Sequence, residues 1–303
     1  AAGLFLSSAA LLSGPAGHGI VMDDARNIFV LEGEESTLRL SKYNKNLALL
    51  GSIPLGSDLR GLQRIATDGT NIYVTAASGT TNGYTKVIKY DPGLAAVATG
   101  TYTTPDGRFG QILYDPGAVY VLYSTGTTPS TTIRRLVTFS PDLSTIVNDV
   151  SVTSLVSGLF NRMVRAGGNL FVGGSNAALT EMYVRKFDSG GNYTGVSSTF
   201  TGAAGGSAQH IAVGPEGTIY AVGGTSVSAG AVQDALVVAY DQNLNQLSSA
   251  AWNAPANGID FARDAVVIAA NRVVATGRSF NGSNFDAVTV NLNLSTFTAA
   301  GGG

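Results

Sequence analysis

One stretch of this sequence returns along the chain, and this internal repeat limits the possible folds more than any other feature. RIATDGTNIYVTAAS at 64–78 recurs as HIAVGPEGTIYAVGGTS at 210–226. Weaker copies lie at 19–33, 111–124, 162–175 and 264–279. Such self-similarity means that each repeat is one small structural unit, which buries its apolar face by stacking against its neighbours. The sequence therefore predicts a repeat protein of six units.

A second motif follows each copy and sets the length of the unit. It reads TKVIKYDPG at 85–93 and ALVVAYDQN at 235–243, and the other copies are weaker. The sixth copy has Asn291 at the position that is aromatic in the first five, and the successive intervals are 47, 49, 48, 53 and 51 residues. The five aromatic residues are Tyr43, Tyr90, Phe139, Phe187 and Tyr240.

Each unit contains four short runs rich in Val, Ile, Thr and Tyr, separated by Gly, Asp, Asn and Pro turns. Short strands at regular spacing with turn signals indicate an all-β repeat, and four strands at a period near 50 residues are typical of β-propeller blades. A TIM barrel would need helical stretches between its strands, and the 39 glycines oppose long helices. We predict a six-bladed β-propeller of four-stranded blades over 17–303, with blades at 17–56, 57–105, 106–154, 155–202, 203–253 and 254–303.

The pattern I-A-x-[DG]-x-x-G-x-I-Y-[AV]-x-G, followed by D-A-x-V-x-x-Y-D, resembles secreted bacterial and archaeal β-propeller repeats of the YVTN, NHL and SBBP-like types. The unit at 210–243 is the nearest match, and 64–93 follows it. The resemblance covers nearly the whole chain after residue 17 and implies a secreted propeller. It implies no particular activity, because propellers carry enzymes, adhesins, receptors and scaffolds alike.

The amino-acid composition excludes several classes of binding partner and of functional site. Charged residues make up 13% of the chain and the net charge is −2, so the chain lacks the electrostatic footprint of a nucleic-acid-binding protein. No apolar run reaches the roughly 18 residues of a transmembrane helix. The sequence contains no Cys, which excludes disulfides, thiolate metal sites and cysteine nucleophiles. Low charge with abundant Ser, Thr, Gly and Asn favours an extracellular or cell-surface location.

Residues 1–16 form an apolar N-terminal arm outside the predicted blades. Left free in water, such a segment favours aggregation, so it must pack on its own propeller, enter a membrane surface or insert into a neighbour. Ala1–Leu12 as an outer strand of the last blade is one alternative. Our main expectation is strand donation to another copy, which builds a filament or surface array from an extracellular structural protein. The side chains expected to drive this self-assembly are Leu4, Phe5, Leu6, Leu11 and Leu12.

The links that enter the innermost strands carry polar residues, and we expect these residues to surround one mouth of a central channel. Arginine dominates them, which favours an anionic or hydroxyl-rich ligand such as a glycan. The alternative function is therefore a secreted binding module, although polar residues at a channel mouth also serve simply to hydrate it. The expected ligand-binding residues are His18, Arg64, Gln111, Arg162, His210 and Arg263.

Catalytic and metal signals are weak. His18 and His210 are the only histidines, and on separate blades they are too far apart to share an ion with Asp264, so we expect no metal and no cofactor. No nucleophile-elbow motif accompanies them, so we assign no catalytic residue and regard the protein as a non-enzyme; a secreted hydrolase or lyase is the third alternative. Asn-x-Ser/Thr sequons mark three candidate glycosylation sites, Asn192, Asn281 and Asn293.

Overall fold

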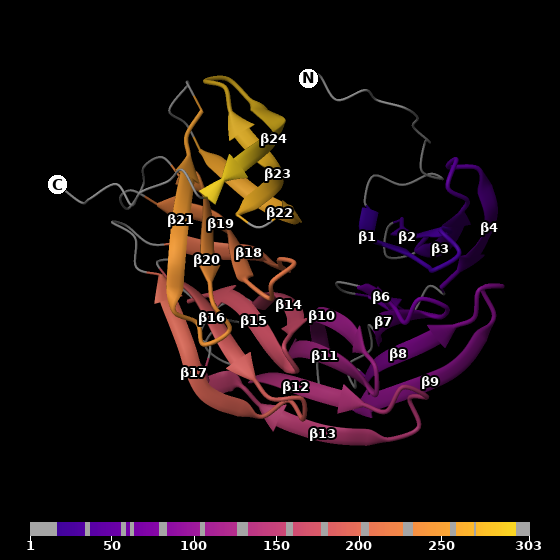
Figure 1. The fold of residues 1–303 in the computed structure, drawn as a ribbon. Coiled ribbons are helices and arrows are strands. Elements are labelled where there is room, and N and C mark those ends of the chain that lie inside the picture. Colours follow the sequence, from indigo (N-terminus) through magenta and orange to yellow (C-terminus); the bar gives the residue numbers. More distant parts are fainter. Residues whose placement is uncertain are drawn as a thin grey trace. The chain divides into compact units, whose positions relative to one another are not determined.

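The computed structural model describes residues 17–33, 37–55, 59–60, 64–78, 84–103, 107–125, 133–155, 160–176, 181–200, 206–226, 233–254, 259–269 and 271–294. The chain divides into two compact units, Ala1–Val152 and Thr153–Gly303. Each unit carries three antiparallel sheets, which follow one another along the sequence as sheets 1–3 and sheets 4–6 (Figure 1).

The first unit holds sheets 1–3, in which hydrogen-bonded neighbours are also neighbours in sequence. In sheet 2 the first strand is split into two short pieces, which both pair with the same second strand. Sheet 1 contains β1 (Gly17–Met22), β2 (Ile28–Glu32), β3 (Arg39–Tyr43) and β4 (Leu49–Pro54). Sheet 2 contains β5 (Leu59–Arg60), β6 (Ile65–Thr67), β7 (Ile72–Ser78), β8 (Tyr84–Tyr90) and β9 (Ala96–Thr103). Sheet 3 contains β10 (Gly107–Asp115), β11 (Ala118–Thr125), β12 (Ile133–Phe139) and β13 (Ile146–Ser151).

The second unit holds sheets 4–6 and opens with a 3-10 helix, η1 (Thr153–Leu155). Sheet 4 contains β14 (Phe160–Ala166), β15 (Asn169–Ser175), β16 (Met182–Phe187) and β17 (Tyr193–Phe200). Sheet 5 contains β18 (Gly206–Val213), β19 (Ile219–Ser226), β20 (Gln233–Tyr240) and β21 (Gln246–Trp252). Sheet 6 contains β22 (Asp260–Ala269), β23 (Arg272–Phe280) and β24 (Phe285–Asn293).

The predicted fold class, an all-β six-bladed β-propeller, is confirmed, with one antiparallel sheet for each repeat. Sheet 6 has three strands within the described residues rather than four. The predicted arm at 1–16, including Ala1–Leu12 as a possible outer strand, lies outside the described residues. Where the structure is described, no helix is long and apolar enough to cross a membrane.

Strand alternation explains how the middle sheet of the first unit fills two cores. On β7, Ile72 and Val74 point into a cluster with Phe29 and Leu31 of sheet 1, while Tyr73 between them enters a cluster with sheet 3. Successive side chains of a strand point to opposite faces, so a sheet that lies between two others is apolar on both. The continuous apolar runs of the repeat, such as Ile72–Val74, lie on the second strands.

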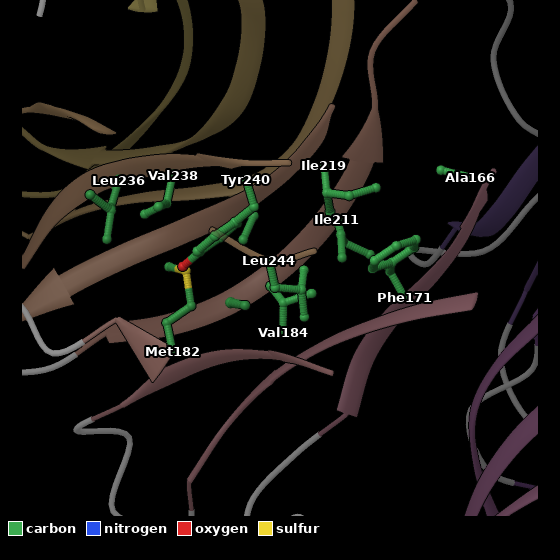
Figure 2. Packing of buried hydrophobic residues seen from close by; sticks show 12 residues of the cluster. Ala166, Phe171, Met182, Val184, Ile211, Ile219, Leu236, Val238, Tyr240 and Leu244 are labelled. Carbon is green, nitrogen blue, oxygen red and sulfur yellow. The ribbon is translucent and has the colours of Figure 1, made fainter. Parts of the chain in front are cut away.

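The second unit repeats this arrangement, with sheet 5 between sheets 4 and 6. Figure 2 shows the cluster shared by sheets 4 and 5, where Phe171 and Val184 meet Ile219 and Tyr240. The next residue on β19, Tyr220, joins the cluster shared with sheet 6. Each such buried side chain contributes about 1.5–3 kcal/mol, so these clusters are the main source of stability within the unit.

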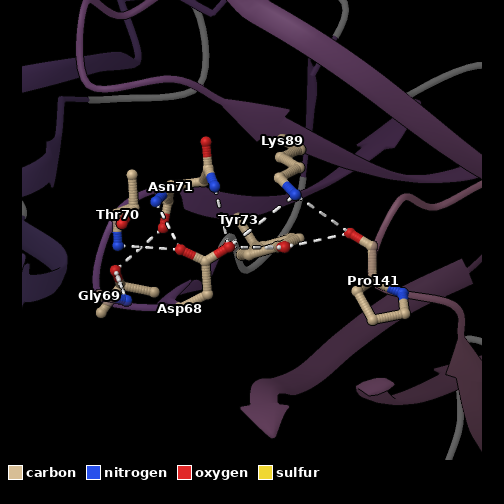
Figure 3. A network of polar contacts seen from close by, with 8 residues as sticks. Asp68, Gly69, Thr70, Asn71, Tyr73, Lys89 and Pro141 are labelled. Carbon is tan, nitrogen blue, oxygen red and sulfur yellow. Dashed lines mark hydrogen bonds and ion pairs between the residues drawn. The ribbon is translucent and has the colours of Figure 1, made fainter. Parts of the chain in front are cut away.

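A polar network links sheets 2 and 3 at one end of β7 (Figure 3). The Tyr73 hydroxyl lies 3.0 Å from Oδ2 of Asp68 and 3.1 Å from the carbonyl oxygen of Pro141, in the turn between β12 and β13 of sheet 3. Lys89 Nζ donates to the same carbonyl at 3.4 Å and lies 5.2 Å from the centre of the Tyr73 ring. Sheet 1 contacts sheet 2 in the same way, because Lys42 donates to the carbonyl of Pro92 at 2.8 Å. These contacts fix the spacing of neighbouring sheets in the first unit.

Candidate functional site

The first strand of most sheets is interrupted at the same place. The register against the second strand shifts at residues 17–19 of β1, 109–111 of β10, 160–162 of β14, 208–210 of β18 and 262–264 of β22. In sheet 2 the break between β5 and β6 falls at this point. A β-bulge changes the direction of the side chains beside it and is common next to binding sites. The repeat thus places an irregular position in the first strand of five sheets and a break at the equivalent point of sheet 2.

The residue directly after each irregularity occupies the same place in its sheet, opposite the fourth or fifth residue of the second strand. Gln111 faces Leu122, Arg162 faces Gly173 and His210 faces Val222. In sheet 2 the backbone N–H of Thr75 donates to the carbonyl of Arg64 at 2.9 Å, which puts Arg64 at this place. The residues at this position in sheets 1–6 are Gly19, Arg64, Gln111, Arg162, His210 and Asp264.

In the second unit the residue at this position in sheet 6 contacts the equivalent residues of sheets 4 and 5. Asp264 lies between the other two: its Oδ1 is 2.8 Å from Nδ1 of His210, and its Oδ2 is 3.6 Å from Nη2 of Arg162. The side chains of Arg162, His210 and Asp264 are 32%, 15% and 54% exposed, so all three remain reachable from solvent. We call these three residues the inner-strand cluster.

The carboxylate of the inner-strand cluster is held in its charged form. Partial burial favours the neutral form of Asp264, but the hydrogen bond and charge of His210, together with the charge of Arg162, outweigh this and keep the pKa of Asp264 below its ordinary value. The backbone N–H of Ala265 also donates to Oδ1 at 2.8 Å. Asp264 therefore presents a fixed negative charge that orients both the imidazole and the guanidinium.

This arrangement combines the groups that recognise a hydroxyl-rich or carboxylated molecule. Arg162 supplies several N–H donors in a planar fork, Asp264 supplies acceptors and His210 has a second ring nitrogen beyond the one that faces Asp264. Binding sites usually depend on a few such groups placed on a rigid apolar scaffold. Within the described ranges, no three His, Asp or Glu side chains gather as metal ligands.

The other predicted ligand-binding residues have different surroundings. His18 lies at the irregularity of β1, one residue before Gly19, and its side chain is outside the described part of the chain. Arg64 and Gln111 belong to the first unit. Arg263 is at the irregularity of β22, and its guanidinium lies over Phe261, with 5.8 Å between Cζ and the ring centre. The equivalent of Arg162 in sheet 6 is therefore the neighbouring Asp264.

The candidate glycosylation sites all lie on exposed backbone. Asn192 is in the turn before β17, Asn281 is in the β23–β24 turn and Asn293 is the last residue of β24. Asn192 Nδ2 donates to the carboxylate of Asp188, and Asn281 Nδ2 donates to Asp286 Oδ2 at 2.9 Å. The candidate self-assembly residues of the arm, Leu4 to Leu12, lie outside the described residues.

A pair of carboxyl groups lies elsewhere in the second unit, on β20 and β22. Burial, and then the negative charge of Asp260, raise the pKa of Asp234. Asp260 is fully buried, and its Oδ2 accepts a hydrogen bond from the backbone N–H of Ala254 at 2.6 Å. Since a fully buried carboxyl group cannot touch a substrate, we assign Asp260 a structural role, which is to hold the backbone of Ala254, just after β21, beside the start of β22.

The similarity to known proteins supports the propeller fold and does not indicate a function. No protein-family model matches the sequence, and no curated protein matches it. The structure is similar to a subtype N10 neuraminidase-like protein of influenza A from the little yellow-shouldered bat, with 12% identity, a TM-score of 0.56, and coverage of 93% of this chain and 94% of that one. It is also similar to cobalt-substituted Synechocystis ACO, with 11% identity, a TM-score of 0.55, and coverage of 92% and 68%. At such low identity, these similarities establish a shared propeller-type fold.

Proposed function

We propose that this protein is an extracellular β-propeller binding module, which takes a hydroxyl-rich or anionic ligand such as a glycan at the inner-strand cluster. The observation that carries the proposal is the contact of Asp264 with both Arg162 and His210, which brings together side chains from three consecutive sheets. Only 13% of the chain is charged, and yet three ionisable side chains lie together at one repeated position. The preset donors and acceptor lower the entropy that is lost when a ligand binds.

The test is retention of labelled protein on an array of neutral and acidic glycans. We expect Arg162→Ala and His210→Ala to reduce retention by about tenfold or more, because each removes a contact worth about 1.4 kcal/mol. Arg272→Ala is the matched control, since Arg272 is an exposed arginine on β23 whose side chain contacts Asn291. If the Arg162→Ala variant retains every glycan that the unaltered protein binds, the ligand site lies elsewhere.

We propose self-assembly through the N-terminal arm as a second candidate function. The outer strands β4, β9, β13, β17 and β21 contain no Lys or Arg, although a lysine at a sheet edge is a common means of preventing pairing with another chain. Four of these strands expose an apolar side chain at their second residue: Leu50, Val97, Val147 and Leu247 are 54%, 54%, 62% and 58% exposed. Such edges suit addition of an extended apolar strand.

A further inference from the structure

The inner-strand cluster contains one group whose charge changes near neutral pH. Arginine keeps its proton throughout this range, and Asp264 stays ionised because its pKa is below the ordinary value. Histidine is the side chain that normally gains a proton as the pH falls from about 8 to about 5. Nδ1 of His210 is shielded from solvent and lies 2.8 Å from Oδ1 of Asp264, so the imidazole meets a fixed negative charge. The protonation state of His210 therefore sets the charge of the cluster.

The charges of the other two members of the cluster cancel. Arg162 carries one positive charge and Asp264 one negative charge, and Nη2 of the arginine lies 3.6 Å from Oδ2 of the carboxylate. With a neutral imidazole the cluster is polar but has no net charge. With an imidazolium it has one net positive charge, because a proton is added to two charges that cancel. The same three side chains thus present two electrostatically different sites.

The strands around His210 offer no second anion to neutralise an added proton. β18 packs chiefly against β14, β15, β16, β19 and β22, and it carries no other ionisable side chain itself. Among the carboxylates of these strands, Asp264 faces the imidazole, whereas Asp260 is fully buried and accepts a hydrogen bond from Ala254. The remaining ionisable side chains on these strands are cations or tyrosines, and none is an anion near neutral pH. They are Arg165, Tyr183, Arg185, Lys186, Tyr220 and Arg263.

We propose that His210 is a protonation switch, which gives the inner-strand cluster a preference for carboxylated sugars in acid and removes that preference above neutral pH. This inference rests on the proposed binding function and specifies its regulation. A sugar carboxylate accepts hydrogen bonds from the planar fork of Arg162, and the imidazolium of His210 supplies the positive charge that Asp264 otherwise cancels. Both donors reach solvent, since their side chains are 32% and 15% exposed. By linkage, a bound anion in turn favours the protonated imidazole.

Calorimetric titration of the full chain at about pH 5.5 and about pH 8 tests this inference with two probes, an acidic oligogalacturonate and a neutral maltooligosaccharide of the same length. We expect the acidic probe to bind at least about fivefold more tightly at the lower pH, because one added charge near a carboxylate is worth about that much in affinity. The affinity of the neutral probe should change by less than about twofold. His210→Gln should remove the pH dependence of the acidic probe. Arg272→Ala, the control on β23, should retain it.

Proton NMR of the histidine rings follows the switch itself in the protein without a probe. The ring signal that is absent from His210→Gln identifies His210, and we expect it to titrate between about pH 8 and about pH 5. A ring that remains uncharged at about pH 5.5 would overturn the switch even if sugars bind.

The binding data separate this inference from the proposed function. If the acidic probe binds equally well at both pH values while Arg162→Ala weakens it, the binding function stands and the switch is wrong. If the neutral probe shows the same pH dependence as the acidic one, charge does not select the ligand and the switch is again wrong. If neither probe binds at either pH, both proposals fail for sugars.

Discussion

At the scale of single residues, each ionisable side chain in this protein owes its behaviour to a few neighbours. Asp264 keeps its charge because His210 and Arg162 face it, although partial burial opposes that charge. Asp234 has the opposite balance, since burial and the charge of Asp260 both favour its neutral form. An aspartate is thus a candidate binding group at position 264, whereas at position 234 its charged form destabilises the fold.

Replacing Asp234 with Asn should stabilise the protein at neutral pH. The folded-state pKa of Asp234 is raised, so the carboxyl group favours folding fully below its unfolded-state pKa, and this contribution is lost as the pH rises through the folded-state pKa. The amide of Asn does not ionise, so the variant does not lose this contribution to stability as the pH rises. Urea unfolding of Asp234→Asn should therefore show a higher midpoint than the unaltered protein near neutral pH, with the difference disappearing in acid.

Asp188→Asn is the control of opposite sign. Burial opposes the charge of Asp188, but hydrogen bonds from Asn192 and Gly190 hold the pKa of this carboxyl group below its ordinary value. Its contribution to stability is present above the unfolded-state pKa and is lost as the pH falls through the folded-state pKa. Asp188→Asn should thus lower the midpoint near neutral pH. A fall in the midpoint of Asp234→Asn under the same conditions would contradict the assignment.

At the scale of elements, one turn recurs between the third and fourth strands of sheets 1–5. An Asp, Asn or Ser begins it, and three residues later the chain enters the left-handed region at Leu47, Leu94, Leu143, Gly191 and Leu244. That conformation costs a leucine roughly 1–2 kcal/mol. Leu94, Leu143 and Leu244 are buried, and burial offsets this cost.

The network of Figure 3 should act as a unit in stabilising sheets 2 and 3. Tyr73→Phe removes a hydroxyl that contacts both Asp68 and Pro141, so we expect a loss of about 1 kcal/mol. Lys89→Met removes the second donor to Pro141. The double variant should show a coupling of about 0.5 kcal/mol or more in urea unfolding, because both side chains share one acceptor.

Lys45→Met is the matched control for this cycle, because Lys45 is exposed in the turn before β4. It should change stability by less than about 0.5 kcal/mol. Strict additivity of Tyr73→Phe and Lys89→Met would mean that the two side chains stabilise the sheets independently.

The repeat made the elements predictable, and the bulges made the site harder to predict. Turn residues and strand-forming runs recur at a steady period, so six sheets follow from pattern alone. The bulge skips one residue in the pairing, which separates the neighbours Arg263 and Asp264 into different environments. Alignment of the inner strands against the second strands would have placed Asp264 beside His210. The stacking of Arg278 on Phe285 depends on cross-strand geometry, for which the sequence carries no local signal.

At the scale of the whole molecule, low charge and outer strands without Lys or Arg in sheets 1–5 favour contact between copies. Charged side chains at a sheet edge are one common means by which soluble proteins prevent strand pairing. The outer strands of sheets 1–5 carry one ionisable carboxylate, Asp149 of β13, and it is engaged by Arg135 and by Tyr102, whose hydroxyl donates to Asp149 Oδ2 at 2.7 Å. Little repulsion opposes an added strand. Head-to-tail addition of this kind builds an open filament unless the rotation closes a ring.

Removal of residues 1–14 should convert an assembling protein into a monomer. We expect light scattering on a sizing column to show large polymers for the full chain and a single folded copy for the truncated one, because a strand of about twelve residues supplies the backbone hydrogen bonds and apolar contacts of the joint. Replacing Leu4, Phe5, Leu6, Leu11 and Leu12 with Ser keeps the length of the arm and should also give monomers. If the full chain itself runs as a folded monomer, the arm does not join copies, and the binding function at the inner-strand cluster becomes the sole proposal.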